Sequence, residues 1–77
     1  MPYSITIDLH GETTISARQK LQSRLNSLPK NTRELVVIHG YRSGTALQET
    51  VRKFKHPKVE RVIIGLNQGE TTLLIKK

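Results

Sequence analysis

The first residues of the chain alternate between apolar and polar side chains with a period of two. The apolar positions are Tyr3, Ile5, Ile7 and Leu9. This alternation predicts a strand with one buried and one solvated face. Asp8 and His10 project together from the solvated face, about 7 Å apart along the strand.

A second apolar run has no polar interruption and predicts a different kind of strand. Leu35–Ile38 is rich in β-branched residues, which is typical of a strand buried on both faces of a parallel sheet. Between the two strands, apolar residues recur at steps of three and four and predict a helix that Thr13 can cap. These residues are Ala17, Leu21, Leu25 and Leu28.

The second half of the chain predicts one more helix and a hairpin. The helix runs from Thr45 to about Lys55 and stops at His56-Pro57, because the residue before a proline disfavours helix. Apolar stretches at 59–66 and 71–75 predict two strands, joined by a turn at 67–70. The predicted order of elements is therefore βαβαββ.

Residues 1–77 are expected to form a single domain, because this length supplies one modest core. The chain has no Cys or Trp, so the core must be aliphatic. Right-handed crossovers with both helices on one side give a two-layer α/β sandwich. A doubly wound sheet, covered on both faces, fits the alternation of the first strand less well.

The two apolar runs that precede the helices end in the same dipeptide, His10-Gly11 and His39-Gly40. Ligands of open α/β sheets bind beyond the carboxyl ends of parallel strands, so two neighbouring imidazoles at this edge are expected to reach one phosphate. The glycine-containing loop that follows leads into the second helix, whose N-terminus favours anions. The phosphate-binding candidates from this strand end, loop and helix are His39, Gly40, Tyr41, Arg42, Ser43, Gly44, Arg52 and Lys53.

Charge indicates the class of partner. Thirteen Lys and Arg against six Asp and Glu give a net charge of +7, and half of residues 52–61 are basic. A clustered positive charge of this size favours nucleic acid, bound with strong salt dependence and low sequence specificity. No apolar run is long enough to span a membrane and no signal peptide is apparent, so we expect a cytoplasmic protein without membrane association. A monomer is the expected oligomeric state.

The chain resembles the small MutS-related, or Smr, domain family along nearly its whole length. Residues 7–11, IDLHG, are similar to the family's LDLHG signature, and 37–44, VIHGYRSG, to its HGxGxG loop. Residues 56–59, HPKV, and the turn 67–72, NQGETT, resemble the segments that close the domain. We expect a free-standing, single-domain member of the family, with a domain cut from a larger protein as the alternative.

This resemblance implies a fold like the C-terminal domain of translation initiation factor 3, with a mixed sheet of order 1-2-4-3 and the last strand antiparallel. It implies nucleic-acid binding, and endonuclease activity in several members. The Asp and His of the signature are implicated in cleavage, which carries over to Asp8 and His10. Two departures weaken the case for catalysis: Arg42 replaces the middle loop glycine, and Gln48 rather than Arg follows Leu47.

The candidate chemistry is metal-free acid–base catalysis by His10, oriented by Asp8. No cofactor is expected; the carboxylates are too few for a two-metal site, and a Zn²⁺ site made by Asp8, His10 and His39 is conceivable but not favoured. RNA, which carries its own 2′-hydroxyl nucleophile, is the expected substrate, with DNA nicking left open. The alternative is a non-catalytic module that binds DNA, RNA or the ribosome, and a small-anion binder is disfavoured because it needs a deep pocket.

Overall fold

The structure is a computed structural model that describes residues 3–40 and 45–76. Its elements are β1 (Ser4–Asp8), α1 (Thr14–Asn26), β2 (Glu34–Ile38), α2 (Ala46–Lys53), β3 (Val59–Ile63) and β4 (Glu70–Ile75). The predicted order βαβαββ is confirmed.

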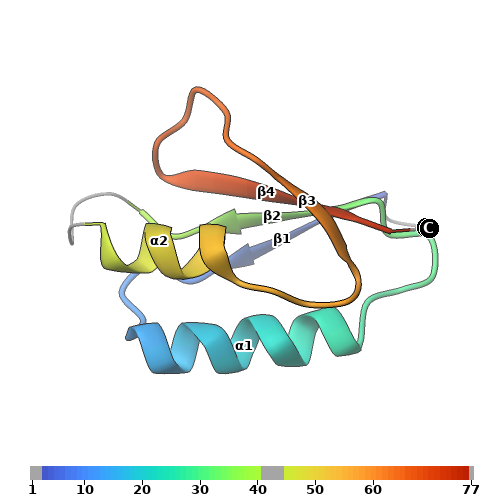
Figure 1. Ribbon diagram of the computed structural model, residues 1–77, viewed down its shortest axis with the longest axis horizontal. Coiled ribbons are helices and arrows are strands. Elements are labelled where there is room, and N and C mark those ends of the chain that lie inside the picture. The colour runs from blue at the N-terminus through green and yellow to red at the C-terminus, as the bar shows by residue number, and fades with distance from the viewer. Residues whose placement is uncertain (1–2, 41–44, 77) are drawn as a thin grey trace.

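The strands form one mixed sheet of order β1-β2-β4-β3. β1 and β2 are parallel and pair in register from Ser4 with Glu34 to Asp8 with Ile38. β4 is antiparallel to both of its neighbours, β2 and β3. Both helices lie on the same side of the sheet, which gives the predicted two layers (Figure 1). The carboxyl ends of β1 and β2 therefore meet at one edge.

The two helices begin in different ways. Thr13 is the N-cap of α1: its hydroxyl accepts a hydrogen bond from the Ser16 amide at 3.0 Å, and the Ser16 hydroxyl accepts one from the Thr13 amide at 3.1 Å. This reciprocal capping box satisfies two amides that the helix leaves without partners. The N-cap of α2, Thr45, makes no such side-chain hydrogen bond.

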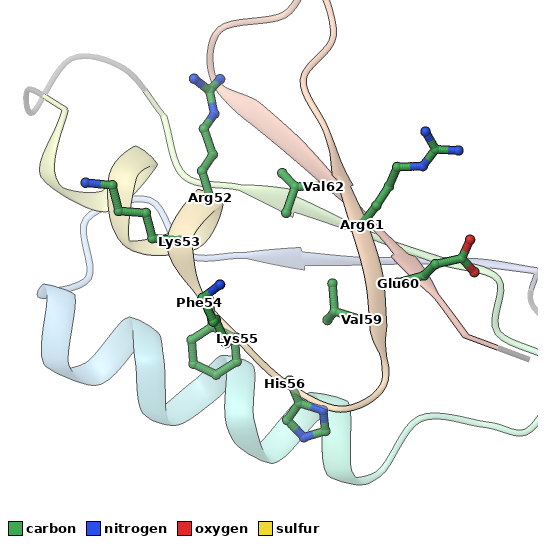
Figure 2. A pocket seen from close by; sticks show the side chains of 9 residues that line it. All are labelled: Arg52, Lys53, Phe54, Lys55, His56, Val59, Glu60, Arg61 and Val62. Carbon is green, nitrogen blue, oxygen red and sulfur yellow. The ribbon is translucent and has the colours of Figure 1, made fainter.

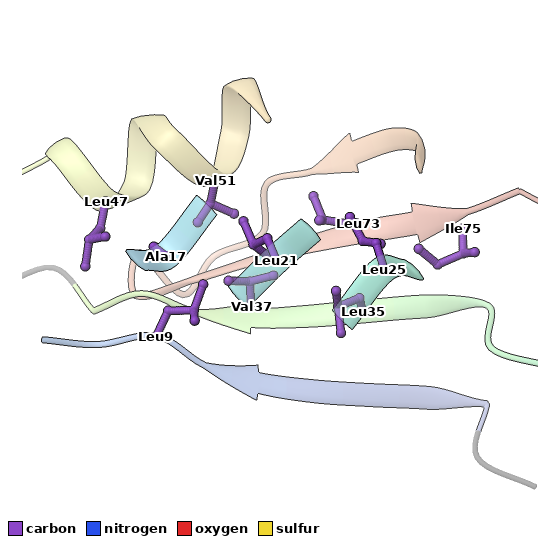
Figure 3. Close-up of a cluster of buried hydrophobic side chains, with 10 residues drawn as sticks. All are labelled: Leu9, Ala17, Leu21, Leu25, Leu35, Val37, Leu47, Val51, Leu73 and Ile75. Carbon is purple, nitrogen blue, oxygen red and sulfur yellow. The ribbon is translucent and has the colours of Figure 1, made fainter. Parts of the chain in front are cut away.

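The core is aliphatic and lies between the sheet and the helices (Figure 3). α1 contributes Ala17, Leu21 and Leu25, each with no exposed surface, at the predicted helical spacing. The other members of the core are Leu9, Leu35, Val37, Leu47, Val51, Leu73 and Ile75. Nearly all of the apolar positions singled out by periodicity are therefore buried or packed against this cluster.

Two expectations about the strands are wrong. β2 is buried on one face only: Leu35 and Val37 face the helices, whereas Val36 and Ile38 are partly exposed on the open face. β3 stops at Ile63, short of the predicted residue 66, because its pairing with β4 ends where Ile63 meets Thr72. Leu66 is consequently fully exposed in the connecting loop.

Candidate functional site

Asp8 and His10 form a hydrogen-bonded pair at the carboxyl end of β1. Nδ1 of His10 lies 2.5 Å from Oδ1 of Asp8, and the His10 amide donates to the same oxygen at 3.1 Å. A carboxylate can only accept, so Nδ1 carries the proton and Nε2 is the nitrogen left to act on a ligand. The side chain of His10 is 72% exposed and that of Asp8 is 52% exposed, so a substrate can reach both without rearrangement.

The proximity of the two groups shifts both titrations. The side-chain hydrogen bond with Asp8, reinforced by the charge of the carboxylate, raises the pKa of the His10 imidazole. The same hydrogen bond, together with the His10 amide, lowers the pKa of Asp8. Asp8 therefore stays ionised at neutral pH, and a larger fraction of His10 is protonated than in a free imidazole.

His39, the second strand-end histidine, is in a different environment. It is 1% exposed. Its Nδ1 lies 2.8 Å from the Gly40 carbonyl oxygen and its Nε2 lies 2.9 Å from Oγ1 of Thr71. Since a carbonyl only accepts, Nδ1 donates to Gly40, and Nε2 then accepts the hydroxyl hydrogen of Thr71.

These contacts correct the expectation that two imidazoles reach one phosphate. Both ring nitrogens of His39 are used inside the protein, which leaves the ring no free donor or acceptor for a ligand. The register of β1 and β2 does bring the two His-Gly dipeptides together: a Cβ at Gly40 would lie 3.5 Å from Cβ of His10. Both glycines also have positive φ, +80° at Gly11 and +74° at Gly40, so each dipeptide ends its strand by the same backbone turn.

Arg52 is joined to this buried histidine through Thr71. Nε of Arg52 donates to Oγ1 of Thr71 at 3.1 Å, while Thr71 donates to His39. Arg52 makes no further side-chain hydrogen bond to the described residues, so its two terminal amino groups can bind an anion. Thr71 is not among the predicted site residues, and its position just after the glycine-containing turn 67–70 was the available signal.

The structure describes two of the remaining predicted phosphate ligands, Lys53 and Gly40. Lys53 is exposed in the last turn of α2. The Gly40 amide donates to the Gly69 carbonyl at 3.0 Å, so this amide is not free to bind a phosphate. The other predicted ligands, Tyr41, Arg42, Ser43 and Gly44, lie outside the described residues.

The described residues do not form a metal site. No group of three His, Asp or Glu side chains among them is placed to hold a metal ion. Glu12, the acidic residue nearest in sequence to the pair, instead binds Lys20 at 2.5 Å and accepts from the Ser16 hydroxyl at 2.7 Å. Of the helices in the described ranges, none is both long and apolar enough to span a membrane.

The fold and this edge define a class: a two-layer βαβαββ domain with an exposed Asp–His pair where the edge strand ends. The Smr domain model matches residues 7–71, and the chain belongs to the Smr domain family. In a crystal structure, the Smr domain of Thermus thermophilus MutS2 has the same fold, with a TM-score of 0.84 at 20% identity. The match covers 95% of this chain and 99% of that domain. No curated protein sequence matches the chain.

Proposed function

We propose that this domain binds nucleic acid and cleaves its phosphodiester backbone by metal-independent acid–base chemistry, with RNA as the substrate. The observation that carries the proposal is the exposed Asp8–His10 pair, in which the carboxylate fixes the Nδ1–H tautomer and directs Nε2 to solvent. Membership of the Smr family and the net charge of +7 support nucleic acid as the ligand.

In the proposed reaction, neutral His10 acts as the general base. Nε2 takes the proton of a 2′-hydroxyl, the 2′-oxygen attacks the adjacent phosphorus, and the bond from phosphorus to the 5′-oxygen breaks. The leaving oxygen takes a proton from solvent. The products are a 2′,3′-cyclic phosphate and a 5′-hydroxyl end. Asp8 stabilises the imidazolium that forms, because it stays ionised next to it.

The phosphate is proposed to bind Arg52 and Lys53 rather than His39. Arg52 suits this role because Thr71 holds its Nε, so less side-chain freedom is lost when the terminal amino groups bind. His39 supports the site indirectly, as the residue to which Thr71 donates.

A binding module that does not cleave is the second candidate. The burial of His39 favours this second candidate. With His39 buried, His10 is the one strand-end imidazole that can reach the substrate, and no second imidazole is available to act as the general acid. In this alternative, Asp8 and His10 are part of a surface that contacts the backbone of DNA, RNA or ribosomal RNA.

The test compares the wild-type protein with His10→Ala on end-labelled single-stranded RNA and on supercoiled DNA, each in EDTA and in Mg²⁺. Thr6→Ala is the matched control, since Thr6 is exposed on the same face of β1. Cleavage of RNA in EDTA, lost in His10→Ala and kept in Thr6→Ala, is the expected result. Salt-sensitive binding by the wild type without cleavage would establish the binding module instead. Faster nicking of DNA than of RNA in EDTA would contradict the role of the 2′-hydroxyl.

A further inference from the structure

A groove of about 560 Å³ lies between the end of α2 and β3 (Figure 2). It exists because α2 packs on β4, which leaves the helix-facing side of β3 only partly covered. Val59 and Val62 of β3 line its floor and are only partly buried, although they pack against the core. The groove thus presents apolar surface directly next to charged side chains.

The walls of this α2–β3 groove are cationic. Arg52, Lys53 and Lys55 come from α2 and the segment after it, and Arg61 comes from β3 on the opposite side. Glu60 is the one carboxylate in its lining, and in Figure 2 its side chain and that of Arg61 both point away from α2, so this cation and this anion lie together at the outer edge of the groove. Four cations against one anion make the groove complementary to a polyanion.

We infer that the α2–β3 groove binds an unpaired segment of the nucleic-acid substrate, with phosphates on its cationic walls and a base on its valine floor. This inference rests on the proposed function and adds to it a preference for single strands. A duplex hides the faces of its bases and offers phosphates alone, so it can use the walls but not the floor. An unstacked base has an apolar face to bury against Val59 and Val62.

Arg52 connects this groove with the Asp8–His10 pair. Its side chain lines the groove, and its Nε is held by Thr71, which donates to His39 at the end of β2. The adjoining Gly40 lies against His10. A strand bound in the groove can therefore extend from Arg52 toward His10 along the edge formed by the ends of β2 and β1. The connection between the groove and His10 favours nucleic acid over an acidic peptide. A peptide could occupy the groove alone, whereas a substrate strand has to reach His10 as well.

The walls are tested with the double variant Lys55→Gln/Arg61→Gln. Its control is Lys30→Gln/Lys76→Gln, which removes the same charge at a hollow on the opposite end of the sheet. Fluorescence anisotropy of a labelled single-stranded RNA is measured over a series of salt concentrations. We expect the wall variant to bind about tenfold more weakly and its salt slope to fall by about 1.4, the value for two lost phosphate contacts on a single strand. The control should stay close to the wild type.

The floor is tested with Val62→Thr, which keeps the shape of the side chain and makes it polar. Ile63→Thr is its control, since Ile63 is the next residue and faces the open side of the sheet. Val62→Thr should weaken binding of single-stranded RNA about threefold and leave binding of the matched duplex unchanged. Ile63→Thr should affect neither.

The outcomes separate this inference from the proposed function. If the wild type binds RNA but the two charge variants weaken binding equally, or Val62→Thr acts equally on single strand and duplex, the groove is not the site and the proposed function stands. If the wild type binds no nucleic acid in low salt, both are wrong. Displacement of the RNA by a poly-glutamate peptide, with no effect of the floor variant, would also overturn the inference.

Discussion

Thr71 and Arg52 come from different elements and meet at a hydrogen bond of 3.1 Å, with the arginine Nε donating to the threonine hydroxyl. The hydroxyl in turn donates to His39, and both Thr71 and His39 are 1% exposed. A buried, fully paired hydroxyl has one orientation available to it. The guanidinium that it holds is therefore oriented by the core and not by solvent.

Removal of this hydroxyl should weaken nucleic-acid binding through Arg52. Thr71→Val keeps the volume of the side chain but releases Nε, so the affinity for single-stranded RNA should fall about threefold to tenfold. In a protein that already carries Arg52→Gln, the same change should have no further effect on affinity. Thr71→Ser should restore binding, and Thr50→Val, which removes a hydroxyl bound to the Ala46 carbonyl of α2, is the matched control. Equal losses from Thr71→Val with and without Arg52 would show that the two residues act independently.

The periodicity of the sequence was sufficient to predict the elements and most of the core. Alternation placed Ile5, Ile7 and Leu9 on the helix-facing side of β1, and the three- and four-residue steps placed Leu21 and Leu25 in the core. These positions are predictable because a helix packed on one face of a sheet buries residues at three- and four-residue steps, and the strand beneath it buries every second residue.

The environment of His39 could not be predicted in the same way. Its partner Thr71 is 32 residues away, and the contact depends on the register of β4 against β2. The exposed Ile64 and Leu66 were also misassigned to a strand, because apolar composition does not show whether a partner strand is present to pair with.

The two helix N-caps should respond differently to the same substitution. Thr13→Ala removes the acceptor for the Ser16 amide and should lower the free energy of unfolding by about 1 kcal/mol. Thr45→Ala removes a side chain that makes no capping hydrogen bond in α2, so its effect should lie within about 0.5 kcal/mol of zero. Urea denaturation of the two variants and the wild type measures both. Equal effects would contradict the difference in capping.

The positive φ angles of Gly11 and Gly40 give a second prediction about stability. Alanine at either position should lower the free energy of unfolding by about 1–2 kcal/mol, because L-residues disfavour the left-handed region. Neither added Cβ meets an atom closer than 3.5 Å, so strain and not collision sets the cost. For a domain of this size each kcal/mol corresponds to about 4–8 °C in Tm. Gly65→Ala is the control, since a Cβ there meets nothing and its backbone carries no such strain; a Tm loss in this variant equal to the others would contradict the explanation.

The pH dependence of cleavage should depend on the hydrogen bond between Asp8 and His10. His10 can act as a base only when it is neutral, so the rate should rise as the pH increases through its pKa. The carboxylate raises that pKa, and the midpoint of the rise should therefore lie above the ordinary imidazole value of about 6.5. In Asp8→Asn the negative charge is gone, the pKa falls back, and the midpoint should move to lower pH.

The maximal rate of Asp8→Asn should fall at the same time, because the amide no longer fixes the Nδ1–H tautomer and Nε2 loses its orientation. Single-turnover rates over a pH series report both effects. An NMR titration of the His10 ring proton, assigned by its absence in His10→Ala, reports the pKa without any activity. The ring-proton signal of His39 is the reference for an unchanged fold, because its partners Gly40 and Thr71 are unchanged by the substitution. A His10 titration that stays in place in Asp8→Asn would show that the pair does not couple in solution, and the assignment of Asp8 to the reaction would then be wrong.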